Sequence, residues 1–291
     1  MTTVYPLKFQ IGPLEITGFG LMMMAAFLVG GWLIARQLRE QKLNEDYAGD
    51  IVFGAVIVSI IGAKVWYVGL HGADSLFSRG GLVWYGGFLG GCLGVTLASL
   101  RRGVPVRFTA QVVAPVLPAA YAIGRVGCFM VGDDYGVATT VPWGVKFPQG
   151  IPPTTAAGLA QFGFPVPPGA NPTDLLAVHP TQLYEVAIMT AVFMLLWHWR
   201  RKTGWGTGAL FGLYLVFAGL ERFAVEFLRA KDDRFFGGLT LAQVTSLAIV
   251  AIGVFWFARM RNLGPVAPVP QPVLRRQCQS SMNTAVMIAT S

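Results

Sequence analysis

Long apolar runs, each close to twenty residues, recur along most of the chain and alternate with short polar segments. A helix needs about 20 mostly apolar residues to cross the hydrocarbon core of a bilayer. Seven runs have this length, at about residues 16–35, 51–70, 82–100, 110–131, 183–199, 208–228 and 239–258. The fourth contains Pro115 and Pro118, which predict a kink. The pattern therefore predicts an all-α integral membrane protein with about seven transmembrane helices.

Positive charge follows every second predicted span. The basic groups after spans one, three, five and seven are Arg36, Arg39 and Lys42; Arg101, Arg102 and Arg107; Arg200, Arg201 and Lys202; and Arg259 and Arg261. Cytoplasmic loops of membrane proteins carry an excess of Lys and Arg. We therefore expect the N-terminus outside and the C-terminus in the cytoplasm.

Two segments do not read as spans. Residues 133–181 form a long, Pro- and Gly-rich loop on the outer side, which we expect to pack over the bundle. Residues 264–291 have the composition of a disordered cytoplasmic tail. The expected organisation is thus a membrane domain over residues 1–263 and a tail over residues 264–291.

Composition supports a membrane protein and excludes several classes. Hydrophobic residues make up 54% of the chain and charged residues 12%, whereas a soluble domain has about 25% charged residues. A soluble enzyme, a disordered protein and a nucleic-acid binder are therefore not expected, and cytoplasmic loops account for the net charge of +8. Cys92, Cys128 and Cys278 form no CxxC pair and no Cys/His cluster with metal spacing. We expect neither a disulfide framework nor a metal site.

Ionisable side chains inside apolar runs are costly and are therefore candidates for function. Arg222, Glu226 and Arg229 in the sixth run follow an i, i+4, i+7 spacing and would share one helix face. They form either an internal salt bridge that orients the helix or a site for an anionic headgroup. In the second case Glu226 acts as an acid or base, or clamps an arginine.

Arg125 in the fourth run has no carboxylate within its own helix turn. It needs either a carboxylate from another span or the phosphate of a ligand, because a buried guanidinium requires a counter-charge. Gly124 and Gly127 beside it would let another backbone or a lipid headgroup approach closely.

Other polar residues have a structural and a functional interpretation. Asp133 is either a solvated helix end or part of a site, and His179 with Glu185 is either an interfacial helix start or part of a site. Lys64 either snorkels or pairs with a glutamate, and Tyr85 among glycines is typical of packing. Most of these residues fall in the outer half of the predicted bundle. Their convergence predicts a cavity that opens toward the outer leaflet and takes an anionic lipid headgroup.

Several ordered motifs carry a resemblance to a known family. They are IGPLEI and GFGLMM near the start, GAK, GGLVWYGGFLGG, GRVGCFMVGDDYG, PWGVKFP, HPTQLYE, RFAVEFLR and LTLAQVTSL. In their order and spacing over roughly residues 10–258 the chain resembles bacterial prolipoprotein diacylglyceryl transferases. HPTQLYE and RFAVEFLR together are the most specific of these motifs.

The resemblance implies an inner-membrane transferase of lipoprotein maturation, with its active site toward the outer leaflet and no cofactor. Such enzymes move the diacylglyceryl group of phosphatidylglycerol to the thiol of a lipobox cysteine in a prolipoprotein, and glycerol 1-phosphate leaves. The implied partners are these two substrates and membrane lipids. The implied headgroup ligands are Arg125 and Arg222. The resemblance also implies that Glu226 supports these arginines and that Gly124, Gly127 and Gly136 match the family's glycines. Besides these, we expect His179, Glu185 and Arg229 as supporting residues, and the catalytic candidates are Glu226, Asp133 and Tyr85.

The chain departs from the family pattern near the expected chemistry. Tyr85 stands where the family usually has a His that has been proposed as the catalytic base, and Cys128 and Val131 stand where Asn is usual. Asp133 replaces the usual Glu. Tyrosine is a poor base at neutral pH because its ordinary pKa is about 10. The thiol proton would instead go to Glu226 or Asp133, or the pocket would lower the thiol's own pKa from about 8.5. A divergent paralogue with another acceptor and a non-catalytic lipid-binding membrane protein remain as alternatives.

Overall fold

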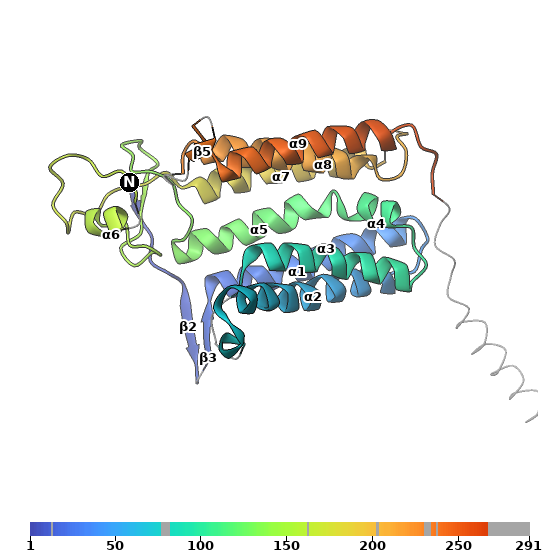
Figure 1. The fold of residues 1–291 in the computed structure, drawn as a ribbon, viewed down its shortest axis with the longest axis horizontal. Coiled ribbons are helices and arrows are strands. Elements are labelled where there is room, and N and C mark those ends of the chain that lie inside the picture. Colours follow the sequence, from blue (N-terminus) through green and yellow to red (C-terminus); the bar gives the residue numbers. More distant parts are fainter. Residues whose placement is uncertain are drawn as a thin grey trace, which may run out of the picture.

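The structure is a computed structural model, and it describes residues 1–12, 14–76, 82–161, 163–201, 204–229, 234–236 and 238–266. Long helices lie side by side in one bundle (Figure 1). The helices of the bundle are α1 (Gly18–Glu40), α2 (Asp46–His71), α3 (Trp84–Arg101), α4 (Val106–Val113), α5 (Val116–Val131), α7 (Thr181–Trp199), α8 (Ala209–Glu226) and α9 (Leu241–Met260). A short 3-10 turn, η1 (Ala73–Ser75), follows α2.

Each predicted apolar run overlaps one of these helices or, for the fourth run, the pair α4 and α5. That pair is bent by 48°, so the kink expected from the prolines is confirmed. Within the described residues, α1, α2 and α9 are long and apolar enough to cross a membrane, and the α4–α5 pair is a fourth candidate. The helical fold of a membrane protein is therefore confirmed. The count of seven spans and the orientation stay predictions.

The packing of the bundle depends on small residues between helices. A Cβ atom on Gly86 or Gly94 of α3 would collide with the carbonyl oxygen of Gly62 or Gly54 of α2. These glycines therefore let the two backbones touch, as is common between membrane helices. Large apolar side chains instead point outward, as at Phe53 on α2, which is 68% exposed. Such exposed apolar surface suits a helix that faces lipid.

The long loop after α5 packs at one end of the bundle and contains the strand β4 (Val145–Lys146) and the short helix α6 (Ala156–Gln161) (Figure 1). Its apolar side chains form a cluster of their own: Tyr135, Val145, Phe147, Leu159 and Val178. The strand β1 (Thr2–Thr3) pairs with β4 in parallel. The N-terminal segment is thereby joined to the loop.

Two further hairpins were not predicted. β2 (Lys8–Ile11) pairs antiparallel with β3 (Leu14–Thr17), directly before α1, and β5 (Arg234–Phe236) pairs with β6 (Leu239–Thr240), directly before α9. Of the expected tail, residues 267–291 lie outside the described residues, as does Cys278. The domain boundaries at 263 and 264 therefore stay a prediction.

Replacement of Gly94 by alanine should destabilise the protein, because the added methyl group would push α3 away from α2 at the backbone of Gly54. Overpacking of this kind costs about 1–3 kcal/mol. Gly69 of α2 is the matched control, since a Cβ atom there would meet nothing within 4 Å. Thermal unfolding in detergent should show a lower Tm for Gly94→Ala, and an unchanged or higher Tm for Gly69→Ala because alanine favours helix. Equal effects of the two substitutions would contradict the close α2–α3 packing.

Candidate functional site

Arg125 of α5 is the centre of a network of polar side chains within the bundle. Its side chain is 12% exposed. Nη2 donates to Oε1 of Glu185 at 2.6 Å, and Nη1 donates to Oδ2 of Asp134 at 2.7 Å. Nε donates to the hydroxyl of Tyr121 at 3.2 Å, and Nη1 also lies 3.6 Å from the sulfur of Cys128. The counter-charge that Arg125 requires thus comes from two carboxylates of the protein.

These partners come from three parts of the chain. Tyr121 and Cys128 lie one turn before and one turn after Arg125 on α5, so the helix itself brings them together. Glu185 lies in the second turn of α7 and is fully buried. Tyr121 donates to the same oxygen of Glu185 at 3.0 Å. The network therefore fixes α7 against α5 at the level of Arg125.

Asp134 connects Arg125 to a second arginine. Its Oδ1 lies 2.5 Å from Nη2 of Arg229, whose side chain is 7% exposed. Gly132 ends α5 in the left-handed conformation, with φ of 69°, and Asp134 also has a positive φ of 61°. This turn folds the chain back so that the carboxylate of Asp134 lies between two guanidinium groups. Left-handed backbone is uncommon for a residue other than glycine.

The start of α7 holds this turn in place. The hydroxyl of Thr181 donates to the carbonyl oxygen of Asp134 at 2.9 Å, and Nε2 of Gln182 donates to that of Asp133 at 2.6 Å. Gly136 allows the close approach, because a Cβ atom there would collide with the carbonyl oxygen of Leu228. The HPTQLYE segment therefore supplies both a counter-ion for Arg125 and the anchors of the Asp134 turn.

The two neighbouring aspartates differ in their electrostatics. Burial alone would raise the pKa of Asp134, but the positive charges of Arg229 and Arg125 outweigh burial and hold the pKa well below its usual range. Burial raises the pKa of Asp133, and the negative charge of Asp134 adds to this effect. Asp134 is thus a firmly ionised counter-ion, and Asp133 is the better proton acceptor of the two.

The charged residues of the predicted polar face of α8 form two separate ion pairs in the structure. Arg222 and Glu226 form an ion pair, with Nη2 of the arginine 2.7 Å from Oε2 of the glutamate. The predicted contact of Glu226 within its own helix is thereby confirmed. The helix ends at Glu226, so Arg229 lies beyond it and pairs with Asp134 instead. The expectation that all three residues share one helix face is wrong, because the regular helix ends too early.

Glu226 also joins α8 to α9. Its Oε1 accepts a hydrogen bond from the hydroxyl of Thr240 at 3.2 Å. Thr240 caps α9 and forms a reciprocal pair of hydrogen bonds with Gln243. Because both oxygens of Glu226 have protein partners, this residue is less suited to take a proton than Asp133.

Tyr121, Asp134 and Glu221 were not assigned to the predicted site. Glu221 is 4% exposed, and its charge interacts with those of Glu185 and Arg125. Oε1 of Glu221 and Nη1 of Arg222 are buried with no hydrogen-bond partner among the described residues. The position of Tyr121 one turn before Arg125 was visible in the sequence. Glu221 is an ionisable residue within the sixth apolar run, which is a signal in the sequence, but its position near Glu185 and Arg125 depends on helix packing.

The other predicted residues lie as follows. Nδ1 of His179 is 3.2 Å from the hydroxyl of Tyr184, and burial lowers the pKa of His179, so its ring is neutral at pH 7. Tyr85 lies on α3, half-exposed, with its ring centroid 6.4 Å from that of Trp66. The ammonium of Lys64 on α2 lies 5.3 Å from the ring centroid of Tyr67.

The two glycines beside Arg125 differ. A Cβ atom on Gly127 would lie 3.1 Å from Cα of Phe19 in α1, so this glycine permits helix packing. A Cβ atom on Gly124 would meet nothing within 4 Å. The predicted approach of another backbone is thus confirmed at Gly127, whereas the space beside Gly124 is open.

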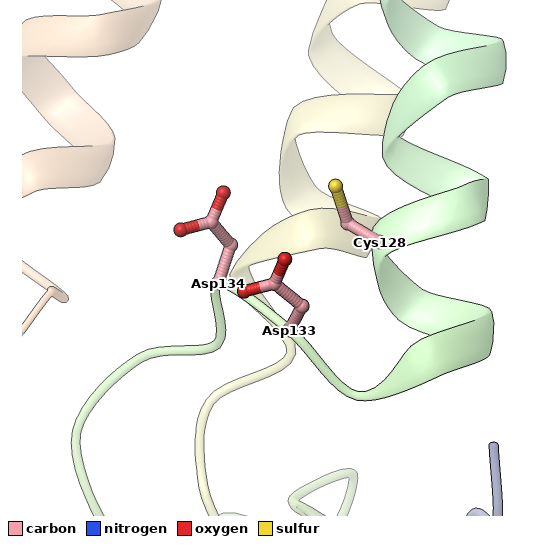
Figure 2. Close-up of side chains that lie close together, drawn as sticks. All are labelled: Cys128, Asp133 and Asp134. Carbon is pink, nitrogen blue, oxygen red and sulfur yellow. The ribbon is translucent and has the colours of Figure 1, made fainter. Parts of the chain in front are cut away.

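Three potential metal ligands lie together at the end of α5. Figure 2 shows the thiol of Cys128 on the helix and the carboxylates of Asp133 and Asp134 on the turn after it. The sulfur and the carboxylate oxygens that could bind a metal lie within 4.8 Å of one another. Both oxygens of Asp134 already face arginines. Two guanidinium groups beside the cluster would repel a metal cation. The residues therefore suit an anion better than a metal ion.

Loss of the Glu226 charge should destabilise the protein more than loss of an exposed charge. Glu226→Gln leaves Arg222 without its carboxylate partner, and breaking a largely buried ion pair costs about 3 kcal/mol. Glu15→Gln is the matched control, since the Glu15–Lys8 pair is about half-exposed on both sides and such pairs contribute about 0–1 kcal/mol. Thermal unfolding of the two variants should separate them clearly. A Tm of Glu226→Gln no lower than that of Glu15→Gln would show that the pair is unimportant.

The stabilisation that Asp134 provides should not change between pH 8 and pH 5. Its folded pKa is lowered, so its contribution is complete above the unfolded pKa of about 3.9 and is lost as the pH falls through the lower folded value. The difference in Tm between the wild type and Asp134→Asn should therefore stay constant over this range. A difference that already shrinks between pH 7 and pH 5 would mean that Asp134 is not held by the arginines.

The chain is similar to known proteins over most of its length. A family model described as prolipoprotein diacylglyceryl transferase matches residues 6–259. A phosphatidylglycerol–prolipoprotein diacylglyceryl transferase of Xanthomonas campestris pv. campestris is 31% identical over 287 residues, covering 92% of this chain and 94% of the relative. Proteins of the same name from Nitratidesulfovibrio vulgaris and Xanthomonas oryzae pv. oryzae are 30% and 32% identical, covering 87% and 92% of this chain and 93% and 94% of the relatives.

Proposed function

Since the chain belongs to the prolipoprotein diacylglyceryl transferase family, we propose that it moves the diacylglyceryl group of phosphatidylglycerol to the cysteine thiol of a prolipoprotein. The observation that carries this proposal is the buried arginine network around Arg125. A phosphate ester carries negative charge, and the planar guanidinium group matches its oxygens. The resemblance assigns this headgroup to Arg125 and Arg222.

We propose seven spans, with the N-terminus outside and the C-terminus in the cytoplasm of a bacterial inner membrane. The basic ends of α1 and α7 meet, because Arg200 and Arg201 lie 2.7 Å and 2.5 Å from the same oxygen of Glu40. In Figure 1 the packed loop with α6 lies at the opposite end of the bundle from α4. The positive-inside rule assigns the basic end to the cytoplasm. The Arg125 network, beside the packed loop, then faces the outer leaflet.

The reaction forms a C–S bond and breaks the S–H bond of the thiol and a C–O bond of the lipid. The thiol loses its proton, the sulfur attacks the carbon of the diacylglyceryl group that bears the phosphate, and the bond from that carbon to the phosphate oxygen breaks. Glycerol 1-phosphate leaves with the bonding electron pair, and a thioether remains. Arginines at the leaving group would neutralise the charge that develops on its oxygen. Nη1 of Arg222 is buried and donates no hydrogen bond to any described residue. This donor therefore suits a phosphate oxygen.

Asp133 is the carboxylate best suited to accept the thiol proton. Its pKa is raised by burial, and a general base works best with a pKa close to the working pH. Glu226 is occupied by Arg222 and Thr240. Tyr85 lies on α3 with its ring beside Trp66, and a phenol is a poor general base at neutral pH because it keeps its own proton. The open space beside Gly124 leaves room for the headgroup next to Arg125.

Transfer of labelled phosphatidylglycerol to a lipobox peptide in a single turnover tests the proposal. Arg125→Gln and Arg222→Gln should reduce the rate by at least about 100-fold, since charge on the leaving group would go uncompensated. Tyr85→Phe should reduce the rate by less than about fivefold, because Asp133 and not Tyr85 is the proposed base. Loss of the general base itself would cost about 10²–10⁴-fold. Arg39→Gln, at an exposed pair with Glu45, is the control and should not change the rate.

The possible failures have different meanings. If the wild type binds phosphatidylglycerol but transfers nothing to any thiol, the protein is a non-catalytic lipid-binding protein. Transfer to other acceptors but not to a lipobox peptide would indicate a paralogue with another substrate. Transfer that survives the loss of Arg222 would reject its role at the phosphate and leave the family assignment unchanged.

A further inference from the structure

We infer that Asp134 is an internal counter-ion that occupies the anion position between Arg125 and Arg229 in the empty site, and that the lipid phosphate displaces it on binding. This inference rests on the proposed function, because it needs a phosphate-bearing ligand. It adds Arg229 to Arg125 and Arg222, the arginines already proposed for the headgroup, and it adds a competition within the site that determines how tightly the headgroup is held.

The first argument is geometric. The two oxygens of Asp134 lie 2.7 Å from Nη1 of Arg125 and 2.5 Å from Nη2 of Arg229. The arginines come from different parts of the chain, one from α5 and one from the segment just after α8. A carboxylate and a phosphate present similar pairs of oxygens to guanidinium groups. Asp134 therefore stands where an external oxyanion would bridge the two arginines.

The second argument is that Asp134 is the carboxylate of this network most easily displaced. Its side chain is 35% exposed, whereas Glu185 is 0% exposed. It lies on the turn after α5 and not within a helix. Its backbone carbonyl is held by Thr181, so a rotation of the side chain alone would free both arginines.

The third argument is that Arg125 would keep its position after such a rotation. Its Nη2 would still donate to Glu185, and its Nε would still donate to Tyr121. Only the Nη1 group would lose its carboxylate partner. Arg229, with 7% of its side chain exposed, would carry a charge that needs a new anion. The phosphate would thus bind to Nη1 of Arg125, which is held in position, and to the guanidinium group of Arg229, which has lost its counter-ion.

The exchange would also assist turnover. A phosphate that must compete with the carboxylate of Asp134 binds less tightly than it would bind to arginines without a counter-ion. Its apparent affinity is reduced in proportion to the fraction of molecules in which Asp134 has turned away. Glycerol 1-phosphate, the leaving group, would be expelled as Asp134 returns. The empty site would remain neutralised and would not retain other anions.

Binding measurements in phosphatidylcholine nanodiscs test the inference without the transfer reaction. The probes are glycerol 1-phosphate and inorganic phosphate, and a second set of nanodiscs contains phosphatidylglycerol. Asp134→Asn keeps the shape and removes the charge, and Asp74→Asn, on the exposed η1 turn, is the matched control. We expect Asp134→Asn to bind glycerol 1-phosphate about tenfold more tightly, with no change for Asp74→Asn. The double variant Asp134→Asn/Arg229→Gln should lose the gain.

The same variants separate the sources of the phosphate. A gain for glycerol 1-phosphate and phosphatidylglycerol, but not for inorganic phosphate, assigns the position to the lipid headgroup. An equal gain for inorganic phosphate assigns it to the phosphate group alone. In the transfer assay Asp134→Asn should lower KM and strengthen product inhibition. Unchanged or weaker binding by Asp134→Asn would overturn the inference.

Two further outcomes keep the test decisive. If Asp134→Asn is less stable, glycerol 1-phosphate should raise its Tm by more than that of the wild type, because the ligand replaces the missing anion. An equal or smaller rise would overturn the inference. If the wild type transfers nothing but Asp134→Asn still gains affinity, the proposed reaction fails and the competition stands. If transfer proceeds and the gain is absent, the competition fails and the reaction stands.

Discussion

A guanidinium group enclosed by helices must be neutralised, and much of this protein's architecture follows from that requirement at Arg125. Glu185 from α7 and Asp134 from the turn after α5 meet the same side chain. The counter-ions therefore determine how α7 packs on α5 and how the long loop leaves the bundle. In a hydrocarbon environment no water would be available to replace them, so the network and the fold depend on each other.

The helices could be predicted from the sequence because the apolar runs have the length of a bilayer crossing. The bend between α4 and α5 followed from Pro115, and the pair Arg222–Glu226 followed from its spacing of four residues. Such features depend on neighbours within one helix, so a local pattern is sufficient to find them.

The remaining features depend on contacts that a single sequence does not display. The bridge from Asp134 to Arg229 exists because α5 ends in a left-handed turn at Gly132 and because α8 ends at Glu226. If either helix ended one turn earlier or later, Asp134 and Arg229 would not be placed to form this ion pair. Glu221 is close to Glu185 only through the packing of α8. The hairpins before α1 and α9 are too short to give a periodic signal.

The glycine contacts between α2 and α3 have a consequence for the path of a lipid. Where the backbones of Gly62 and Gly86 touch, no side chain fits between the two helices, so an acyl chain cannot pass between them at this level. Under the proposed function, a phospholipid with its headgroup at Arg125 would therefore place its tails between other helices at this level.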